Sequence, residues 1–167
     1  MQHEAFEGDP VAKLGELLRD IRFAMLTTID EAGKLVSRPL STRAIDFDGD
    51  LWFFTDDRSE KIAQIQRNPN VNLGYASKDQ ETHVSVSGTA SMLRDQRRIH
   101  ELWNAIDNAY FQGKDDPHLV LLKVEVESAE YWDTPGNFFT KTLSFARALA
   151  THDPSRLGEN ATLELKQ

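Results

Sequence analysis

Several features are missing from this sequence, and each absence narrows the functions open to it. None of its 167 residues is cysteine, which excludes disulfide frameworks, thiolate metal sites and cysteine nucleophiles. No stretch approaches the roughly 20 consecutive apolar residues that a membrane helix needs. The first residues lack the basic and then apolar order of a signal peptide. We therefore expect a cytoplasmic protein that has no membrane partner.

Positive charge is also scarce. The chain carries 19 Lys and Arg against 27 Asp and Glu, a formal net charge of -8. Such a surface repels phosphate backbones, so we expect no nucleic-acid partner, and any anionic ligand needs a local basic pocket. The five histidines show no metal-ligand spacing, and no glycine-rich nucleotide loop or nucleophile motif occurs. The sequence predicts no metal site and leaves the catalytic residues unknown.

The hydrophobic pattern predicts a mostly β (α+β) protein. Period-two or strongly apolar runs predict strands at 23–29, 35–47, 51–55, 71–76, 83–93 and 119–126. Helical spacing predicts helices that follow Asp9-Pro10 and that cover 57–67, 95–108 and 137–149. Short connections between such strands favour an antiparallel barrel with peripheral helices. We expect one domain over residues 1–150, followed by a polar, frayed tail over 151–167.

Two turn signals refine this prediction. Pro39 cannot donate a hydrogen bond to a strand ladder, so the strand over 35–47 should be an edge strand or carry a bulge near Arg38. Asp48-Gly49 is a tight-turn dipeptide between two strand patterns, and it predicts a hairpin of 35–47 with 51–55.

The segment from Phe54 to Lys61 carries the most local chemistry. It places the end of a strand directly before a helix start, where free backbone N–H groups and the helix dipole favour an anion. Arg58 and Lys61 add positive charge, and we place Lys61 in the second helical turn. The alternative is a solvated helix start in which Asp57 and Glu60 form a capping box.

The chain also resembles a known family. Arg38-Pro39-Leu40-Ser41-Thr42-Arg43, followed by Phe54-Thr55 and Ser59-Glu60-Lys61, resembles the flavin-phosphate signature of pyridoxamine 5'-phosphate oxidase-like split barrels. Asn68-Pro69, the run from Thr82 to Gly88, Asp115-Asp116-Pro117 and the run from Glu130 to Asp133 follow in the order of the general stress protein 26 branch. The resemblance covers Arg22 to Asp133. It implies a split barrel that binds FMN, or alternatively FAD, at the interface of a homodimer.

The resemblance further implies a set of cofactor-binding residues: Arg38, Pro39, Leu40, Ser41, Phe54, Thr55, Ser59, Lys61, His83 and Trp132. In it, Arg38 approaches the phosphate or ribityl chain, and Ser59 and Lys61 hold the phosphate. The residues that follow Arg38, together with the Phe54-Thr55 pair, line the flavin ring. His83 reaches the flavin from the partner subunit, and Trp132 packs beside it.

For each of these residues an ordinary structural role is the alternative. Arg38 and Lys61 could face solvent, His83 could be a hydrogen-bonded strand residue, and Trp132 could belong to the core. Tyr131 and Trp132 alternate in direction, so one of the two at most can face the core.

Two departures from the family pattern bear on function. Glu60 stands where the family carries an arginine, so Arg58 could substitute for that arginine, or phosphate binding could be weaker. No arginine-containing carboxy-terminal segment of the kind that binds pyridoxamine phosphate is found, and Arg156 is the single candidate.

The resemblance thus points to a flavin-dependent oxidoreductase of unknown substrate. The alternatives are a non-catalytic flavin-binding stress or storage protein, and a split barrel for deazaflavin or haem. Arg43 could stabilise a reduced flavin ring if a bulge at Pro39 brought it to the side of Arg38.

Overall fold

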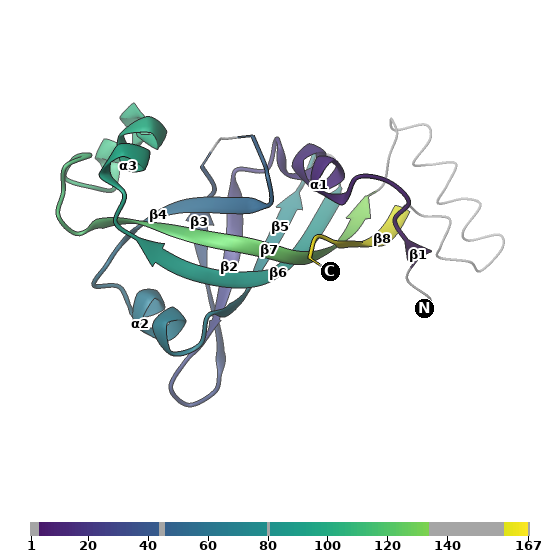
Figure 1. Ribbon diagram of the computed structural model, residues 1–167, viewed down its shortest axis with the longest axis horizontal. Helices are drawn as coiled ribbons and strands as arrows, with labels where there is room; N and C mark the ends of the chain where they lie inside the picture. Colours follow the sequence, from purple (N-terminus) through teal and green to yellow (C-terminus); the bar gives the residue numbers. More distant parts are fainter. Residues whose placement is uncertain (1–3, 44–45, 80, 134–158, 167) are drawn as a thin grey trace.

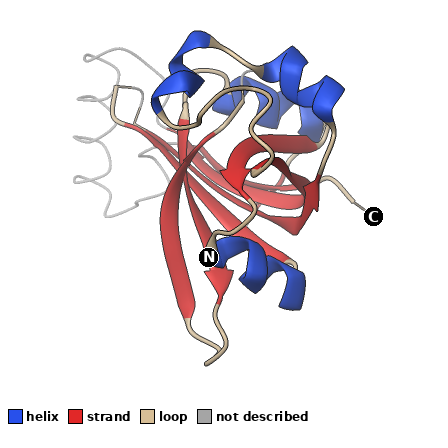
Figure 2. Cartoon of the chain, turned by 90° about the vertical axis from the view of Figure 1, so that its left-hand side faces the viewer, coloured by secondary structure: helices blue, strands red, loops and turns tan. Residues whose placement is uncertain are grey.

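The computed structural model describes residues 4–43, 46–79, 81–133 and 159–166. Within these ranges the chain forms an eight-stranded sheet with helices around it (Figures 1 and 2). The strands are β1 (Glu4–Ala5), β2 (Phe23–Ile29), β3 (Leu35–Ser41), β4 (Asp50–Asp56), β5 (Asn70–Ser77), β6 (Thr82–Leu93), β7 (Leu119–Asp133) and β8 (Glu159–Glu164). The helices are α1 (Pro10–Leu18), α2 (Glu60–Arg67), α3 (Gln96–Leu102) and the 3-10 helix η1 (Ala105–Ala109). No helix in these described ranges has the length and apolarity to cross a membrane.

The sheet curls into a barrel that does not close. Its strands follow the order β1-β8-β7-β6-β5-β2-β3, and β4 pairs with the first half of β7. Every ladder is antiparallel except the short one between β1 and β8. Where β3 and β4 approach each other, an isolated bridge between Thr42 and Phe53 takes the place of a ladder. The predicted mostly β, antiparallel split barrel with peripheral helices is confirmed.

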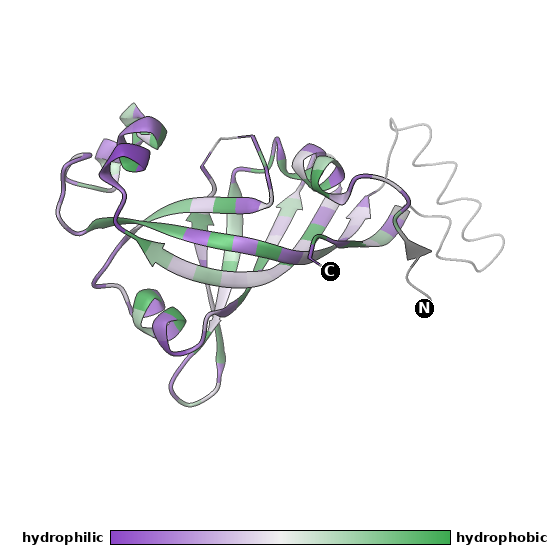
Figure 3. Cartoon of the chain, in the orientation of Figure 1, coloured by the Kyte–Doolittle hydropathy of each residue, from purple (hydrophilic) through white to green (hydrophobic). Residues whose placement is uncertain are grey.

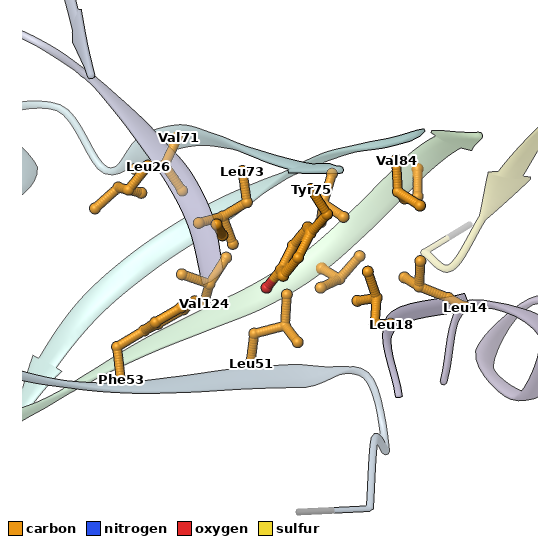
Figure 4. Close-up of a cluster of buried hydrophobic side chains, with 14 of the residues drawn as sticks. Leu14, Leu18, Leu26, Leu51, Phe53, Val71, Leu73, Tyr75, Val84 and Val124 are labelled. Atoms are coloured by element: carbon orange, nitrogen blue, oxygen red, sulfur yellow. The ribbon is translucent and has the colours of Figure 1, made fainter. Parts of the chain in front are cut away.

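The main core fills the inside of this barrel. Figure 4 shows apolar side chains of β2, β4, β5, β6, β7 and α1 converging around the ring of Tyr75. The buried Tyr75 hydroxyl shares a hydrogen bond of 2.9 Å with Thr42 Oγ1. Period-two alternation places these side chains inside and polar ones outside, and Figure 3 shows this alternation along β7. The inner face of the sheet is therefore fixed by the burial of Leu26, Leu73 and Val86.

A second, smaller cluster lies on the other side of β4. Phe54 packs there against Trp103 and Phe111, with ring centroids 5.8 and 6.2 Å away. The ion pair of Arg43 and Asp107 is buried beside them, with Nη1–Oδ1 2.7 Å and Nη2–Oδ2 2.8 Å. This cluster attaches α3 and η1 to the barrel.

The two turn predictions have different outcomes. Pro39 does lie on an edge strand, but the register of β2 with β3 is continuous from Phe23–Ser41 to Ile29–Leu35, so there is no bulge. The edge alone accommodates a residue that cannot donate to a ladder. The predicted hairpin across Asp48-Gly49 is reduced to a single antiparallel bridge between Thr42 and Phe53, because β3 ends at Ser41 and β4 forms its ladder with β7. Asp48-Gly49 favours a reversal of the chain, but these two residues do not determine which strand β4 pairs with.

The predicted helix over 95–108 is two elements. The backbone of Trp103 is extended, and Asn104 starts η1 with a capping box in which its side chain and that of Asp107 take part. As a result Ile106 is half exposed instead of sharing the buried face of Ile99. The capping box at Asn104 thus starts a new helix, although the spacing of apolar residues predicted that α3 would continue.

The end of the chain also differs from the prediction. The expectation of a frayed polar tail after Thr151 is wrong for Glu159–Glu164, which form β8 against the second half of β7. Leu163 is fully buried in the main core. Ala161 is buried with it, and Leu165 packs against the same core, so a mostly polar segment supplies enough alternating apolar side chains for a strand. The helix predicted over 137–149 lies outside the described residues.

Candidate functional site

Two positively charged side chains lie within electrostatic reach of each other, between the edge of the barrel and the start of α2. Arg38 comes from β3 and Lys61 from the first turn of α2, and both are partly buried. We call this group the cationic cluster; it consists of Arg38, Lys61, Thr28, Thr55, Ser59 and Gln64. Four of the ten predicted site residues, namely Arg38, Thr55, Ser59 and Lys61, thus lie in one place.

Uncharged partners orient the guanidinium of Arg38. Its Nη1 donates to Thr28 Oγ1 at 2.6 Å, and its Nη2 donates to Gln64 Oε1 at 3.1 Å. Thr28 in turn donates to Gln64 Oε1 at 2.6 Å. Thr28 is fully buried and Gln64 nearly so, which makes this a satisfied internal network. Burial lowers the pKa of Arg38, and the negative charge of Glu60 acts in the opposite direction.

The ammonium of Lys61 is held at the end of β4. Its Nζ donates to Thr55 Oγ1 at 2.9 Å, and Thr55 is buried. Ser59, the N-cap of α2, lies beside them, with its Oγ 3.5 Å from Thr55 Oγ1. Because α2 begins at Glu60, Lys61 lies in the first helical turn, and our placement in the second turn is wrong. Burial, and then the nearby charge of Arg38, lower the pKa of the Lys61 ammonium.

The charge of Arg38 acts on Lys61, and no carboxylate of the described residues pairs with either cation. Among the described residues, neither Arg38 nor Lys61 has a carboxylate oxygen within 4.0 Å. Glu60 and Asp56 act on them through longer-range attraction alone. On a chain with net charge -8, two partly buried like charges that act on each other form a local positive site.

The charges that directly precede this helix already have ionic partners. Arg58 forms a two-point pair with Asp56, at 2.9 Å from Nε and 2.6 Å from Nη2, and this pair lowers the pKa of the Asp56 carboxyl. Asp57 pairs with Arg94 and accepts a hydrogen bond of 3.0 Å from His118 Nδ1. The capping box of Asp57 with Glu60 is therefore wrong. Arg58, our candidate substitute for the missing family arginine, is tied to Asp56 and exposed.

The other predicted residues of β3 diverge from the cationic cluster. Pro39 is exposed on the outer face of the sheet, opposite Met25. Leu40 packs against the main core. Ser41 accepts a hydrogen bond of 3.2 Å from Arg22 Nε. Consecutive strand residues point to opposite faces, so a contiguous motif cannot line one side of a site with side chains alone.

Phe54 and Arg43 belong to the second cluster. Phe54 alternates with Thr55 along β4, so its ring points away from the cationic cluster and is 7% exposed. Arg43 lies over that ring, 4.3 Å from its centroid, and pairs with Asp107. Without a bulge at Pro39, Arg43 does not join Arg38. The suggestion that Arg43 serves the flavin ring is therefore wrong for this arrangement.

His83 and Trp132 are neighbours on the outer face of the sheet. They are register partners on β6 and β7, and both are exposed. The adjacent Val84 and Tyr131 are buried, which confirms that Tyr131 and not Trp132 faces the core. Arg38, opposite the buried Leu26, is on the inner face. Within one chain the predicted site is therefore divided between two faces of the sheet.

Sequence reasoning missed Thr28 and Gln64. A signal for both was present, because each is a polar residue at a position where the pattern calls for an apolar one. Thr28 continues the buried alternation of Ala24 and Leu26, and Gln64 lies between Ile62 and Ile65 on the buried side of α2. Among the described residues, by contrast, no group of three acidic or histidine side chains is arranged to hold a metal ion.

Comparison with known proteins gives one consistent result. Residues 9–155 match the sequence pattern of the family described as pyridoxamine 5'-phosphate oxidase like. The chain is 31% identical to general stress protein 26 of Bacillus subtilis over 120 residues, which cover 65% of this chain and 86% of that protein.

Solved structures agree with this result. A crystal structure from Jannaschia sp., described as a general stress protein 26, superposes with a TM-score of 0.75 at 26% identity and covers 92% of this chain and 97% of its own. The general stress FMN/FAD binding protein of Xanthomonas citri superposes with a TM-score of 0.67 at 28% identity and covers 77% of this chain and 91% of its own.

Proposed function

Because this chain belongs to the pyridoxamine 5'-phosphate oxidase-like family, we propose that it binds a flavin phosphate at the cationic cluster, with FMN as the ligand and FAD as the alternative. The relative from Xanthomonas citri is described as binding FMN or FAD, which supports this proposal. Spectra of the purified protein test it and also separate flavin from deazaflavin or haem. A flavin protein absorbs near the flavin maxima or acquires that absorbance on titration; a protein that stays colourless with both FMN and FAD refutes the proposal.

The observation that carries this proposal is the pair of unneutralised cations. Placing Arg38 beside Lys61 without a carboxylate costs free energy through repulsion and lost hydration, and a bound anion relieves both. A phosphate group accepts charge-assisted hydrogen bonds from both side chains. Lys61 also lies in the first turn of α2, and a helix N-terminus favours an anion. The side chains present therefore fit a phosphate group.

We further propose that the protein is a flavin-dependent oxidoreductase whose substrate is unknown. The flavin supplies the redox chemistry, and the protein supplies phosphate anchoring and a polar and apolar surround for the ring. The test is reduction of the bound flavin by a nicotinamide donor followed by reoxidation with a defined acceptor. Sustained turnover supports the enzyme, whereas a flavin that binds and is never reduced favours the non-catalytic storage protein.

The division of the site between two sheet faces leads us to propose a homodimer. His83 and Trp132 cannot reach a ligand on Arg38 of the same chain, because they are on the opposite face of the sheet. A second copy can present its own outer face to that ligand. The outer face also exposes Phe23 (55%), Met25 (46%) and Trp132 (40%), apolar surface that such a contact would bury.

Replacing Met25 by aspartate should separate the dimer, because it places a charge within this apolar face. We expect sedimentation to report the 19.0 kDa mass of a single chain for Met25→Asp and twice that mass for the unmodified protein. Ile106→Asp is the matched control, since Ile106 is a half-exposed apolar residue on η1, away from this face. An unmodified protein that remains a single chain at every concentration contradicts the dimer.

As the pH is raised, FMN binding should begin to weaken at a lower pH than it would if Lys61 had the usual pKa of a lysine. The free Lys61 ammonium has a lowered pKa, whereas a bound phosphate favours the protonated form. The contribution of Lys61 to affinity is thus complete below that lowered pKa and begins to fall as the pH rises through it, at a lower pH than for a lysine with the usual pKa of about 10.4. Titrations between about pH 7.5 and 10.5 stay above the second phosphate ionisation near 6. Riboflavin, which lacks the phosphate, corrects for ionisation of the ring; equal pH dependence of both ligands counts against the role of Lys61.

A further inference from the structure

The arginines of this chain differ in whether their hydrogen-bond acceptors are charged. Arg43 is paired with Asp107, Arg58 with Asp56, and Arg94 with Asp57, so each of these charges is neutralised by a carboxylate. Arg38 is different, because its terminal nitrogens contact a hydroxyl, a side-chain amide oxygen and, at 3.5 Å, the backbone carbonyl of Leu26. Within the part of the chain that the structure describes, every acceptor at Arg38 is uncharged.

The uncharged acceptors are themselves firmly placed. Thr28 has no exposed surface and Gln64 is 7% exposed, and their mutual hydrogen bond of 2.6 Å fixes both side chains. Gln64 Oε1 accepts from Thr28 and from Arg38 together, which leaves no freedom for the amide to flip without losing both bonds. Buried polar groups of this kind are costly unless every hydrogen bond is made, so their arrangement specifies one position for Arg38.

We propose that Thr28 and Gln64 form a neutral clamp, which orients Arg38 toward the flavin phosphate while leaving its positive charge available. This proposal rests on the proposed function and assigns two positioning residues to the same site. A carboxylate at position 64 could hold the guanidinium equally well, but it would cancel the charge that attracts the phosphate. The choice of an amide over a carboxylate is therefore a functional property of the site.

The decisive variant is Gln64→Glu, titrated with FMN and with riboflavin. The new carboxylate keeps the hydrogen bonds of the clamp, so the protein should fold with undiminished thermal stability. Its affinity for FMN should fall by at least about tenfold, because one charge at the phosphate is cancelled. Its affinity for riboflavin should stay within about twofold, because no phosphate is present. Gln66→Glu is the matched control, since it adds the same charge to an exposed position of the same helix and should change FMN affinity by no more than about threefold.

A second pair of variants tests the hydroxyl group of Thr28. These variants also test the clamp if Gln64→Glu does not fold. Thr28→Val keeps the shape of the side chain and removes the hydrogen bonds, so FMN affinity should fall by about fivefold or more. Thr28→Ser restores the hydroxyl and should recover affinity to within about twofold. Recovery by serine is not expected if Thr28 serves packing alone, because serine lacks the methyl group.

The possible failures are distinguishable. If the unmodified protein binds FMN, and Gln64→Glu binds it equally well or loses FMN and riboflavin alike, the clamp is overturned and the flavin site stands. The same holds if Thr28→Val binds FMN as well as the unmodified protein. If the unmodified protein takes up neither flavin, the proposed function itself falls, and the clamp falls with it.

Discussion

Replacing Lys61 by methionine should weaken FMN binding by roughly 1.5–3 kcal/mol, the range for a hydrogen bond that involves a charged group. The substitution keeps most of the apolar stem and removes the ammonium that we place on the phosphate. The measurement is the dissociation constant by fluorescence or calorimetric titration, and the loss corresponds to about 10- to 100-fold. Affinity for riboflavin should be unchanged, because the lost interaction is with the phosphate.

The same substitution should not lower the stability of the protein without ligand. The charged Lys61 is partly buried beside Arg38, an arrangement that lowers its pKa and opposes folding. Removing the charge relieves that cost, so the free energy of unfolding should stay constant or rise. Lys34→Met, at an exposed turn position, is the control and should leave both binding and stability as they are. Loss of FMN affinity that is matched by loss of stability would mean that Lys61 is a structural residue.

Replacing Asp107 by alanine should destabilise the protein by about 3–5 kcal/mol, the cost of leaving one member of a buried ion pair without its partner. The side chains of Arg43 and Asp107 are 6% and 5% exposed, and both of their short contacts disappear together. Asp107 also accepts from the backbone N–H of Asn104 at 2.9 Å, so the cap of η1 is lost as well. Urea unfolding monitored by tryptophan fluorescence measures the difference.

Two comparisons identify the cause of this destabilisation. Asp56→Ala removes the partner of the exposed Arg58 and should change stability little, since solvent screens such pairs. The double variant Arg43→Met with Asp107→Leu replaces the ion pair by apolar side chains and should recover much of the loss. An Asp107→Ala protein within about 1 kcal/mol of the unmodified protein would contradict the buried pair.

The strand alternation explains how far sequence reasoning could reach. Period-two patterning located β2, β5 and β6 closely, because each has one buried and one exposed face. It could not show that β4 pairs with β7, since that choice depends on contacts between residues about 70 positions apart, such as Phe53 with Leu122. For the same reason Arg43 and Asp107, 64 residues apart, gave no sign of their pairing.

The candidate site was predictable in part for a related reason. Thr55, Ser59 and Lys61 lie close together in sequence, so the strand-to-helix junction that gathers them is a local feature. Arg38 joined them in the prediction through the family resemblance, and in the structure Gln64, from the same helix as Lys61, and Thr28 hold its guanidinium. Those two residues carry no charge and match no motif, and their role becomes visible when both are found buried around the same guanidinium.

The account depends on a phosphate group lying between Arg38 and Lys61, and one comparison of ligands tests this most directly. FMN and riboflavin differ in the phosphate group alone, so calorimetric titration of the unmodified protein with each ligand measures what the phosphate contributes to binding. We predict that FMN binds at least about tenfold more tightly and that added salt reduces this advantage, as expected for charge-assisted contacts. Equal affinity for the two ligands, at any salt concentration, would contradict the account.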